Sequence, residues 1–469
     1  MQLMNIVGSI YKLLDYDVSS PKSIEDYAKK LIGKKFSDIS NETSRTSNEK
    51  AKGGLGQFVE EEYFHYECNS NPTPDFEEAG VELKVTPYKK NSSGQISAKE
   101  RLVITMIDYN EVVEESFENS HVWNKGKLML LIYYLYDSEI KNRLDYRIDY
   151  VTLFTPPDED IEIIKQDFET IVNKVKAGKA HELSEGDTLY LGACTKSSDS
   201  SKRRSQPFSD ELAKPRAFAF KNSYMTYVLN NYIIKSSQTY ESIVTGKINM
   251  PFEKYVVQQI SRFEGCSQRQ LCNEFGIALE RVPKNLGAML AYRMLGIKGN
   301  TAEEFVKANI IVKTIRINKH GSIKESMSFP TFKFKELAEE TEWEDSQIYN
   351  YLSDKRFLFV IYKENNDGEM ILKGCQFWNI PYFDLNANVQ LTWERTKRVI
   401  NEGIKVEYVN GVRRNNFPTQ KDNPVCHVRP HGRNASDVDE LPDGSSFTKQ
   451  CFWLNNTYIK SQLDDVFFE

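Results

Sequence analysis

Apolar and polar residues follow regular patterns along the first half of the chain. Residues 81–86 alternate between apolar and polar side chains, as on a half-buried β-strand. Residues 128–134 are continuously apolar, which predicts a central strand buried on both faces. Residues 161–175 carry apolar side chains at helical spacing, and Gly178 follows as a suitable C-cap. Together these elements predict an α/β fold with a mixed central sheet and flanking helices.

The same pattern recurs in the second half, in the same order and at about the same spacing. The apolar run 128–133 is matched by 357–362, and residues 218–224 near the end of the first half are matched by 452–458. The period is too long for a solenoid of short repeats, so the pattern indicates a duplicated domain.

The two expected domains are separated by a polar stretch. Residues 235–246 show neither of the two patterns. We therefore expect one domain in residues 1–235 and a second in residues 246–469. The amphipathic segment 1–14 has no basic leader and no small-residue cleavage site, so we expect a helix of the first domain and not a signal peptide.

Composition and charge narrow the class of protein. The net charge is −6, so a nucleic-acid partner would need local basic clusters, such as those at 202–204 and 429–433. The seven cysteines are scattered along the chain, which favours a reducing, cytoplasmic setting. No apolar run approaches the roughly 20 residues of a membrane helix. No Gly-x-x-x-x-Gly-Lys-Ser/Thr motif is present, so a nucleotide cofactor is not expected.

The two copies differ in their charged residues. Three charged positions of the first copy are replaced in the second: Glu60 by Ala291, Glu82 by Ile311 and Lys125 by Asp354. The second copy still has an acid, Glu304, and a lysine, Lys313. This difference indicates an enzyme with one working site and one lost site.

The charged residues of the first copy suit phosphodiester hydrolysis. The period of a strand places Glu82 and Lys84 on one face, and Asp75 in the preceding loop can reach the same end. Two carboxylates and the carbonyl of Leu83 can hold Mg²⁺, which prefers oxygen ligands. Lys84 can then orient or deprotonate a water that attacks phosphorus in line with the leaving 3′ oxygen.

The pattern of an acid and a lysine two residues apart is weak by itself. Glu139 and Lys141 have the same spacing, and an exposed strand face with solvated charges would have it as well. The replacement of the middle carboxylate by Ile311 is not expected of a merely solvated face, so it favours the catalytic interpretation.

Two histidine-containing segments have simpler interpretations than metal binding or base catalysis. Cys426, His427 and His431 fall within six residues and have no partner pair elsewhere, which is poor spacing for zinc. A strand and loop that contact DNA are the better interpretation. His121 is expected to make local hydrogen bonds, since Lys84 is better placed as a base.

Several segments resemble the MutH-like nucleases. The sequence is most similar to the two-domain, GATC-specific type II restriction endonucleases of the Sau-three-A group. The resemblance spans nearly the whole chain and is carried by residues 52–60, 74–87, 97–102, 178–186 and 426–431. It implies duplicated PD-(D/E)xK domains of the restriction-endonuclease type, dependence on Mg²⁺, and cleavage of double-stranded DNA at GATC that leaves 5′-phosphate ends.

The resemblance also implies roles for individual residues. In the catalytic site, Asp75, Glu82 and Leu83 would hold the metal, Lys84 would be the catalytic lysine, and Glu60 and Lys125 would complete the site. The residues expected at the DNA are Lys52, Lys196, Lys202, Arg203, Arg204, Tyr224, Arg429, His431 and Tyr458. Lys196 occupies the family's base-reading loop, but Cys194 and Thr195 stand where the family has Arg-Pro. Arg429 and Pro430 are closer to that pattern, so the second copy is expected to bind DNA.

We therefore interpret the chain as a type II restriction endonuclease of a restriction–modification system. The first domain would cut, and the inactive second domain would bind a second recognition site or act as an allosteric effector, with self-association on DNA that carries two sites. One alternative is a MutH-type mismatch-repair nicking enzyme, but that type has a single domain. Another is a DNA-binding protein that does not cut, and the set Asp75, Glu82 and Lys84 speaks against it.

Overall fold

The computed structural model divides into two compact units. It describes residues 15–39, 54–66, 71–91, 93–197, 199, 201–236, 239–246, 248–278, 283 and 285–469. The first unit comprises residues 1–183, 187–239 and 306–308, and the second comprises 184–186, 240–305 and 309–469. The expected helix in 1–14 and the expected DNA contact at Lys52 lie outside the described residues. No helix in the described part of the chain is long and apolar enough to cross a membrane.

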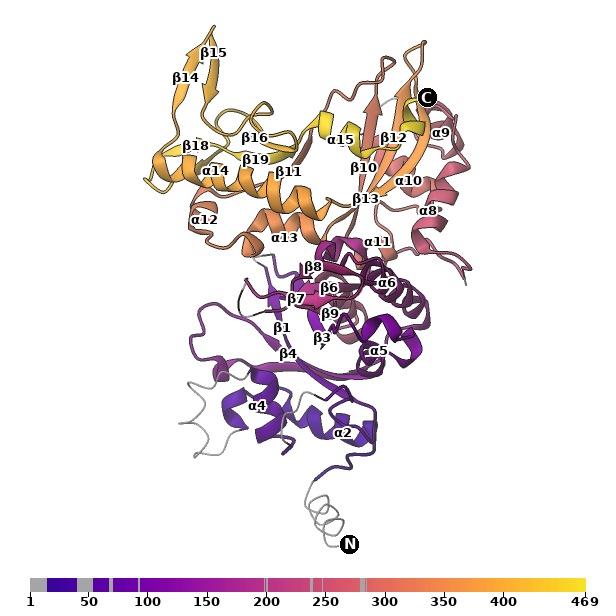
Figure 1. The fold of residues 1–469 in the computed structure, drawn as a ribbon, viewed down its shortest axis with the longest axis vertical. Coiled ribbons are helices and arrows are strands. Elements are labelled where there is room, and N and C mark those ends of the chain that lie inside the picture. The colour runs from indigo at the N-terminus through magenta and orange to yellow at the C-terminus, as the bar shows by residue number, and fades with distance from the viewer. Residues whose placement is uncertain are drawn as a thin grey trace. The chain divides into compact units, whose positions relative to one another are not determined.

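The first unit contains a mixed four-stranded sheet, in agreement with the α/β prediction (Figure 1). Its order is β2-β1-β4-β5, with β1 parallel to β4 and the other pairs antiparallel. These strands are β1 (Glu82–Lys90), β2 (Ile96–Ala98), β4 (Met129–Leu135) and β5 (Ile148–Phe154). The apolar run predicted as a central strand is β4, and its residues from Met129 to Tyr133 are fully buried. Parallel pairing of β1 with β4 places Glu82 beside Met129 and Lys84 beside Leu131.

A second sheet and a set of helices complete the first unit. The second sheet has the order β3-β9-β6, and a short hairpin of β7 and β8 connects β6 to β9. These strands are β3 (Leu102–Met106), β6 (Leu191–Thr195), β7 (Arg204–Gln206), β8 (Ser209–Ala213) and β9 (Arg216–Phe220). The helices are α2 (Pro21–Ala28), α4 (Leu55–Glu62), α5 (His121–Gly126), α6 (Asp158–Lys176) and α7 (Asn222–Tyr227). Helix α6 confirms the helical stripe predicted at 161–175.

The second unit repeats this arrangement of strands. Its first sheet has the order β10-β12-β13, with β10 parallel to β12, and its second has the order β11-β19-β16. Two further hairpins, β14–β15 and β17–β18, stand outside these sheets. The strands are β10 (Ile310–Ile317), β11 (Met327–Thr331), β12 (Arg356–Glu364), β13 (Met370–Trp378), β14 (Val406–Val409), β15 (Val412–Asn415), β16 (Cys426–Pro430), β17 (Val438–Glu440), β18 (Ser446–Thr448) and β19 (Gln450–Leu454). The helices are α8 (Phe252–Ser261), α9 (Gln268–Glu274), α10 (Leu286–Met294), α11 (Glu303–Lys307), α12 (Phe334–Glu339), α13 (Gln347–Asp354), α14 (Gln390–Glu402) and α15 (Asn456–Gln462).

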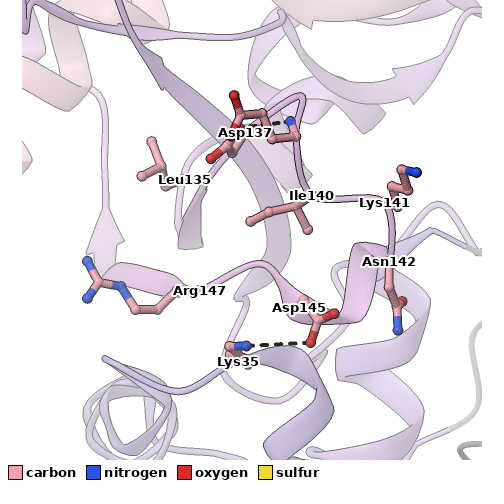
Figure 2. A pocket seen from close by; sticks show the side chains of 9 residues that line it. Lys35, Leu135, Asp137, Ile140, Lys141, Asn142, Asp145 and Arg147 are labelled. Carbon is pink, nitrogen blue, oxygen red and sulfur yellow. Dashed lines mark hydrogen bonds and ion pairs between the residues drawn. The ribbon is translucent and has the colours of Figure 1, made fainter.

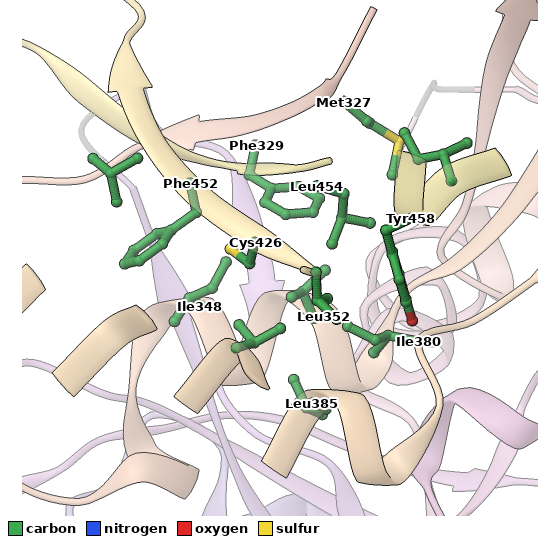
Figure 3. Packing of buried hydrophobic residues seen from close by; sticks show 14 of the residues in the cluster. Met327, Phe329, Ile348, Leu352, Ile380, Leu385, Cys426, Phe452, Leu454 and Tyr458 are labelled. Carbon is green, nitrogen blue, oxygen red and sulfur yellow. The ribbon is translucent and has the colours of Figure 1, made fainter. Parts of the chain in front are cut away.

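Helices α13 and α14 and the sheet β11-β19-β16 enclose the core of the second unit. Figure 3 shows Phe329, Phe452 and Leu454 from the sheet facing Ile348 and Leu352 from α13. These side chains are all almost inaccessible to solvent. Burial of each large apolar side chain contributes about 1.5–3 kcal/mol, so this cluster is the main source of stability in the unit.

Matching caps and hydrogen bonds support the correspondence of the two units. Ser120 caps α5 by accepting from the backbone N–H of Trp123, and Ser346 caps α13 by accepting from that of Tyr349. Such serine caps fix where a helix begins. The strand pairing is also repeated, because Glu82 of β1 pairs with Met129 and Ile311 of β10 pairs with Phe357. The strand register therefore matches Phe357 with Met129. The sequence had matched Phe357 with Leu128, so the predicted match of the apolar runs is shifted by one residue.

One glycine of this shared framework makes a testable difference between the units. A Cβ atom added to Gly287 in α10 would lie 2.2 Å from the hydroxyl oxygen of Thr314 in β10, whereas nothing lies within 4 Å of one added to the matching Gly56 in α4. Gly287→Ala is expected to destabilise the chain by about 1–3 kcal/mol through overpacking. Gly56→Ala is expected to change stability by less than about 1 kcal/mol. Thermal unfolding of both variants measures this, and equal shifts would contradict the close packing at Gly287.

Candidate active site

The loop before β1 and the first residues of β1 bring two carboxylates together. The backbone N–H of Leu83 donates to a carboxylate oxygen of Asp75 at 2.8 Å, and the N–H of Asp75 donates to Glu82 at 3.3 Å. An isolated bridge between Phe76 and Val81 closes the loop between them. This reciprocal pair of hydrogen bonds fixes Asp75 at the start of the strand beside Glu82.

Two lysines from different elements converge on Glu82. The side chain of Glu82 is 3% exposed, and the ammonium of Lys84 lies 2.7 Å from one of its oxygens. The ammonium of Lys125, near the end of α5, lies 3.2 Å from the other. Lys84 also donates to the backbone carbonyl of Ile104 at 3.4 Å. The structure thus brings together four side chains that span 50 positions of the sequence: Asp75, Glu82, Lys84 and Lys125.

Negative charge accumulates at Asp75. Burial and the nearby carboxylates of Glu82 and Glu60 raise the pKa of Asp75 to about 6, against the lowering effect of the Leu83 N–H and of Lys84. Glu60 lies on α4, which packs against β1. The site therefore has an excess of carboxylates that a cation would stabilise.

The raised pKa of Asp75 predicts how stability depends on pH. Its folded-state pKa of about 6 exceeds the usual 3.8, so stability is lost as pH rises through 6 and the buried group ionises. In the metal-free chain, Asp75→Asn is expected to raise the melting temperature at pH 8, where Asp75 is charged. At pH 5 the carboxyl group is largely protonated, and the difference should shrink. Thermal unfolding with a chelator at both values tests this, and a pH-independent difference would contradict it.

The corresponding positions of the second unit lack this chemistry. Ile311 is partly buried against the apolar core, and Ala291 is fully buried in α10. The retained acid, Glu304, accepts hydrogen bonds from the hydroxyl of Ser242 and from the backbone N–H groups of Ile243 and Val244, at 2.7 to 3.0 Å. Glu304 therefore holds residues 242–244 in place by hydrogen bonds and does not face a reaction site.

The matching serine caps offer Tyr351 as an alternative to the predicted Asp354 for the counterpart of Lys125. Lys125 is five residues after the cap Ser120, and the residue five after the cap Ser346 is Tyr351. Asp354 lies on an additional part of α13 and accepts a hydrogen bond from Asn309 at 2.7 Å. Neither Tyr351 nor Asp354 is a cation, so either match leaves the second unit without an equivalent of Lys125.

The basic residues expected at the DNA lie on the surface of the first unit. Lys196 directly follows β6, and Lys202 to Arg204 lead into β7; the side chains of all four are exposed. They occupy the segment between β6 and the β7–β8 hairpin. A phosphate backbone can reach such side chains without any change in the fold.

Tyr224 and Tyr458 are not placed where DNA could touch them. Tyr224 is inaccessible to solvent, and its hydroxyl donates to Asp160 at 3.1 Å. Tyr458 is 7% exposed, and its hydroxyl donates to Asp384 at 2.7 Å. The prediction that these tyrosines contact DNA is therefore corrected. Each forms a hydrogen bond inside its unit: Tyr224 of α7 with Asp160 of α6, and Tyr458 of α15 with Asp384, just before α14.

Arg429 and His431 surround an aromatic side chain that the sequence analysis missed. The guanidinium of Arg429 lies over the ring of Trp453 at 5.2 Å, and the ring of His431 meets the same ring edge-on at 5.3 Å. Arg429 and His431 are exposed. Strand periodicity is the signal that could have identified Trp453, because its neighbours Phe452 and Leu454 point into the core on the opposite face.

A zinc site at this strand is not formed. Cys426 is fully buried in the core, and the ring of His427 is buried and hydrogen-bonded to Asn455. Among the described residues, no group of three or more His, Cys, Asp or Glu side chains could hold a metal ion. The six described cysteines are all free. Asp75 and Glu82 thus form a pair of carboxylates, not a larger metal-binding cluster.

A surface pocket of about 620 Å³ in the first unit is separate from the carboxylate pair (Figure 2). It is lined by Leu135, at the opposite end of β4 from the residue that pairs with Glu82, and by the loop of Asp137 to Asn142. Lys35 and Asp145, 3.6 Å apart, form an ion pair across it. Glu139 and Lys141, which share the acid-x-lysine spacing, lie here among solvated charges.

Comparisons with known proteins agree with this geometry. The family described as DNA mismatch repair enzyme MutH matches residues 64–167, which include Asp75, Glu82, Lys84 and Lys125. The DNA mismatch repair protein MutH of Shewanella woodyi is 28% identical over 38% of this chain and 76% of its own length. That of Vibrio campbellii is 27% identical over 37% of this chain and 76% of its own length. The MutH family match thus lies within the first unit.

A further relative covers both units. The type II restriction enzyme Sau3AI of Staphylococcus aureus is 37% identical over 95% of this chain and 98% of its own length. The chain therefore belongs to the family of the type II restriction enzyme Sau3AI. It is a type II site-specific deoxyribonuclease.

Proposed function

We propose that the first unit cleaves double-stranded DNA at GATC by Mg²⁺-dependent hydrolysis and leaves 5′-phosphate ends. The observation that carries the proposal is the buried carboxylate of Glu82, which is shared between the ammonium groups of Lys84 and Lys125 and lies beside Asp75. The GATC specificity rests on the resemblance to the restriction enzymes of this family. Double-stranded DNA is thus the substrate.

The residues at this site suit a divalent cation. Asp75 and Glu82 offer carboxylate oxygens and Leu83 a backbone carbonyl, a set of hard oxygen donors typical of Mg²⁺. Burial and, after it, the neighbouring carboxylates raise the pKa of Asp75, and a bound cation would stabilise its ionised form. When bound, Mg²⁺ supplies Lewis-acid stabilisation of the charge that develops on phosphate oxygens.

The two lysines have distinct tasks in the proposed reaction. Lys84 is held by Glu82 and by the carbonyl of Ile104, so its ammonium is fixed where it can orient the attacking water. Lys125 approaches Glu82 from α5 and can neutralise the charge on the phosphoryl group. Glu60 on α4 holds further negative charge near Asp75.

The second unit is proposed to be a duplicated PD-(D/E)xK domain without catalytic activity. Its strand order and helix caps parallel those of the first unit, while Ile311 and Ala291 replace two of the charged residues. Its exposed Arg429 and His431 around Trp453 are suited to a second recognition site. We assign it the role of an effector that gathers two DNA sites and allows self-association on DNA. The free cysteines suit a reducing cytoplasm.

A mismatch-repair nicking activity of the MutH type is the second candidate function. The relatives named MutH align with only 37–38% of this chain, whereas Sau3AI aligns with 95%. The additional unit therefore favours restriction over repair.

The effector role predicts that cleavage depends on the number of sites. One active site cuts one strand at a time, and a second DNA-binding unit raises the local concentration of one site near the other. A plasmid with two GATC sites is expected to be cut faster than a matched plasmid with one, and Arg429→Ala is expected to shrink that advantage. Arg269→Ala, which removes an exposed cation elsewhere in the second unit, is the control. Equal rates of the wild-type enzyme on both plasmids would reduce the second unit to a structural partner.

A further inference from the structure

The hairpin β14–β15 is an addition to the framework that the two units share. In the first unit, residues 177–190 join α6 to β6 and contain only short 3-10 turns. In the second unit, residues 403–425 join α14 to β16 and contain the hairpin. It stands out from the rest of its own unit in Figure 1. Asn410 and Gly411 form its turn with φ of 53° and 76°, a pairing strongly favoured in two-residue hairpins.

The hairpin contributes little to the core of its unit. Its two strands pair only with each other. Tyr408 is 74% exposed and Val406 is 39% exposed. An isolated two-stranded hairpin is marginally stable at best, and this one is anchored by the guanidinium of Arg413, which lies over the ring of Phe447 at 5.1 Å. Folding of the unit therefore does not explain why the hairpin is present.

The exposed side chains of the hairpin favour an anionic partner. Lys405, Arg413 and Arg414 are exposed cations, against the single acid Glu407, in a chain whose net charge is −6. The strand register places Tyr408 directly opposite Arg413. Phe447, which Arg413 contacts, lies on β18, and the single residue Lys449 joins β18 to β19, the strand that carries Trp453. The cations of the hairpin and those around Trp453 thus belong to neighbouring elements.

We propose that the β14–β15 hairpin is a ribbon that grips the DNA duplex bound by the second unit. A two-stranded ribbon fits the major groove of B-DNA. Arg413 and Arg414 contact phosphates or base edges, and Tyr408 packs against the backbone with its hydroxyl as a donor. The inference rests on the proposed effector role of the second unit and identifies the element that performs it.

Binding of a second duplex to the full chain tests this inference. The Glu82→Ala chain is titrated with a labelled GATC duplex over a range of salt concentrations, and the affinity of the second duplex bound per chain is measured. Arg413→Ala with Arg414→Ala is expected to weaken the second binding event and to reduce its salt slope by roughly 1.8, which corresponds to two lost phosphate contacts. Lys254→Ala with Arg269→Ala removes two exposed cations elsewhere in the unit and is expected to leave the slope unchanged.

Two further variants separate folding from binding. Arg414→Glu keeps the contact of Arg413 with Phe447, so it should weaken binding of the second duplex without lowering the melting temperature of the protein. Tyr408→Ala should also weaken binding of the second duplex, with little change in the salt slope. An unchanged slope and affinity in the Arg413/Arg414 variant would overturn the inference while the effector role stands. Failure of the Glu82→Ala chain itself to bind a second duplex would overturn both.

Discussion

Glu82→Ala is expected to abolish DNA cleavage while DNA binding persists. Glu82 contacts both lysines and lies beside Asp75, with which it is proposed to bind the metal. Its loss should remove several kcal/mol of charge stabilisation at phosphorus, which corresponds to a rate loss of about a thousandfold or more. Single-turnover cleavage and DNA-binding assays measure the two effects. Cleavage within about tenfold of the wild-type rate, or 1.4 kcal/mol, would contradict the assignment.

Two variants control for indirect effects of this change. Glu139→Ala removes the exposed acid from the other acid-x-lysine sequence of the first unit, which lines the pocket in Figure 2, and cleavage should be unaffected. Glu82→Gln preserves the shape and the acceptor oxygen beside Lys84 and should still be inactive. A normal melting temperature for Glu82→Gln would show that inactivity does not come from unfolding.

Glu304→Ala is expected to destabilise the second unit by about 2–4 kcal/mol. Its carboxylate is 6% exposed and accepts three hydrogen bonds from residues 242–244. Removal leaves the buried N–H of Ile243 unsatisfied, at a cost of about 1–3 kcal/mol, and opens a cavity. Glu304→Gln retains an acceptor and should lose less stability. Thermal unfolding distinguishes two roles of Glu304. If the carboxylate has this structural role, Glu304→Ala lowers the melting temperature. If it is a former metal ligand, the same substitution relieves carboxylate repulsion and raises the melting temperature.

Local periodicity was sufficient to predict the arrangement of the catalytic strand. Alternation along 81–86 placed Glu82 and Lys84 on one face, and the ammonium and carboxylate are 2.7 Å apart. The continuous apolar run at 128–134 predicted the strand β4, which is buried on both faces. These features depend on neighbours within a few residues, so the sequence pattern contains them.

Contacts between distant residues were not predictable in the same way. Tyr224 meets Asp160 across 64 residues, and nothing in the local sequence distinguishes a buried tyrosine from one at DNA. The counterpart of Lys125 was predicted from its position before the apolar strand, whereas the serine caps that begin the two helices offer Tyr351 instead of Asp354. Glu304 was similarly ambiguous, because its partners at 242–244 lie in a separate segment.

The hairpin β14–β15 was not predicted from the sequence. The Asn410-Gly411 turn and the flanking valines are a recognisable hairpin signal, but they have no counterpart in the first half of the chain. Matching segments of the two halves do not include an insertion that only one half has. The three-dimensional structure is needed to show that the hairpin is additional to the shared strands and helices and is exposed.

Mapping the ends of DNA fragments tests the central claim most directly. A plasmid of known sequence is incubated with Mg²⁺ and either the wild-type chain or Glu82→Ala, and the fragment ends are sequenced. The wild-type chain is expected to produce ends only at GATC, each with a 5′ phosphate, and the variant is expected to produce none. Ends at other sequences, or GATC ends from the Glu82→Ala chain, would contradict a GATC endonuclease whose only active site lies in the first unit.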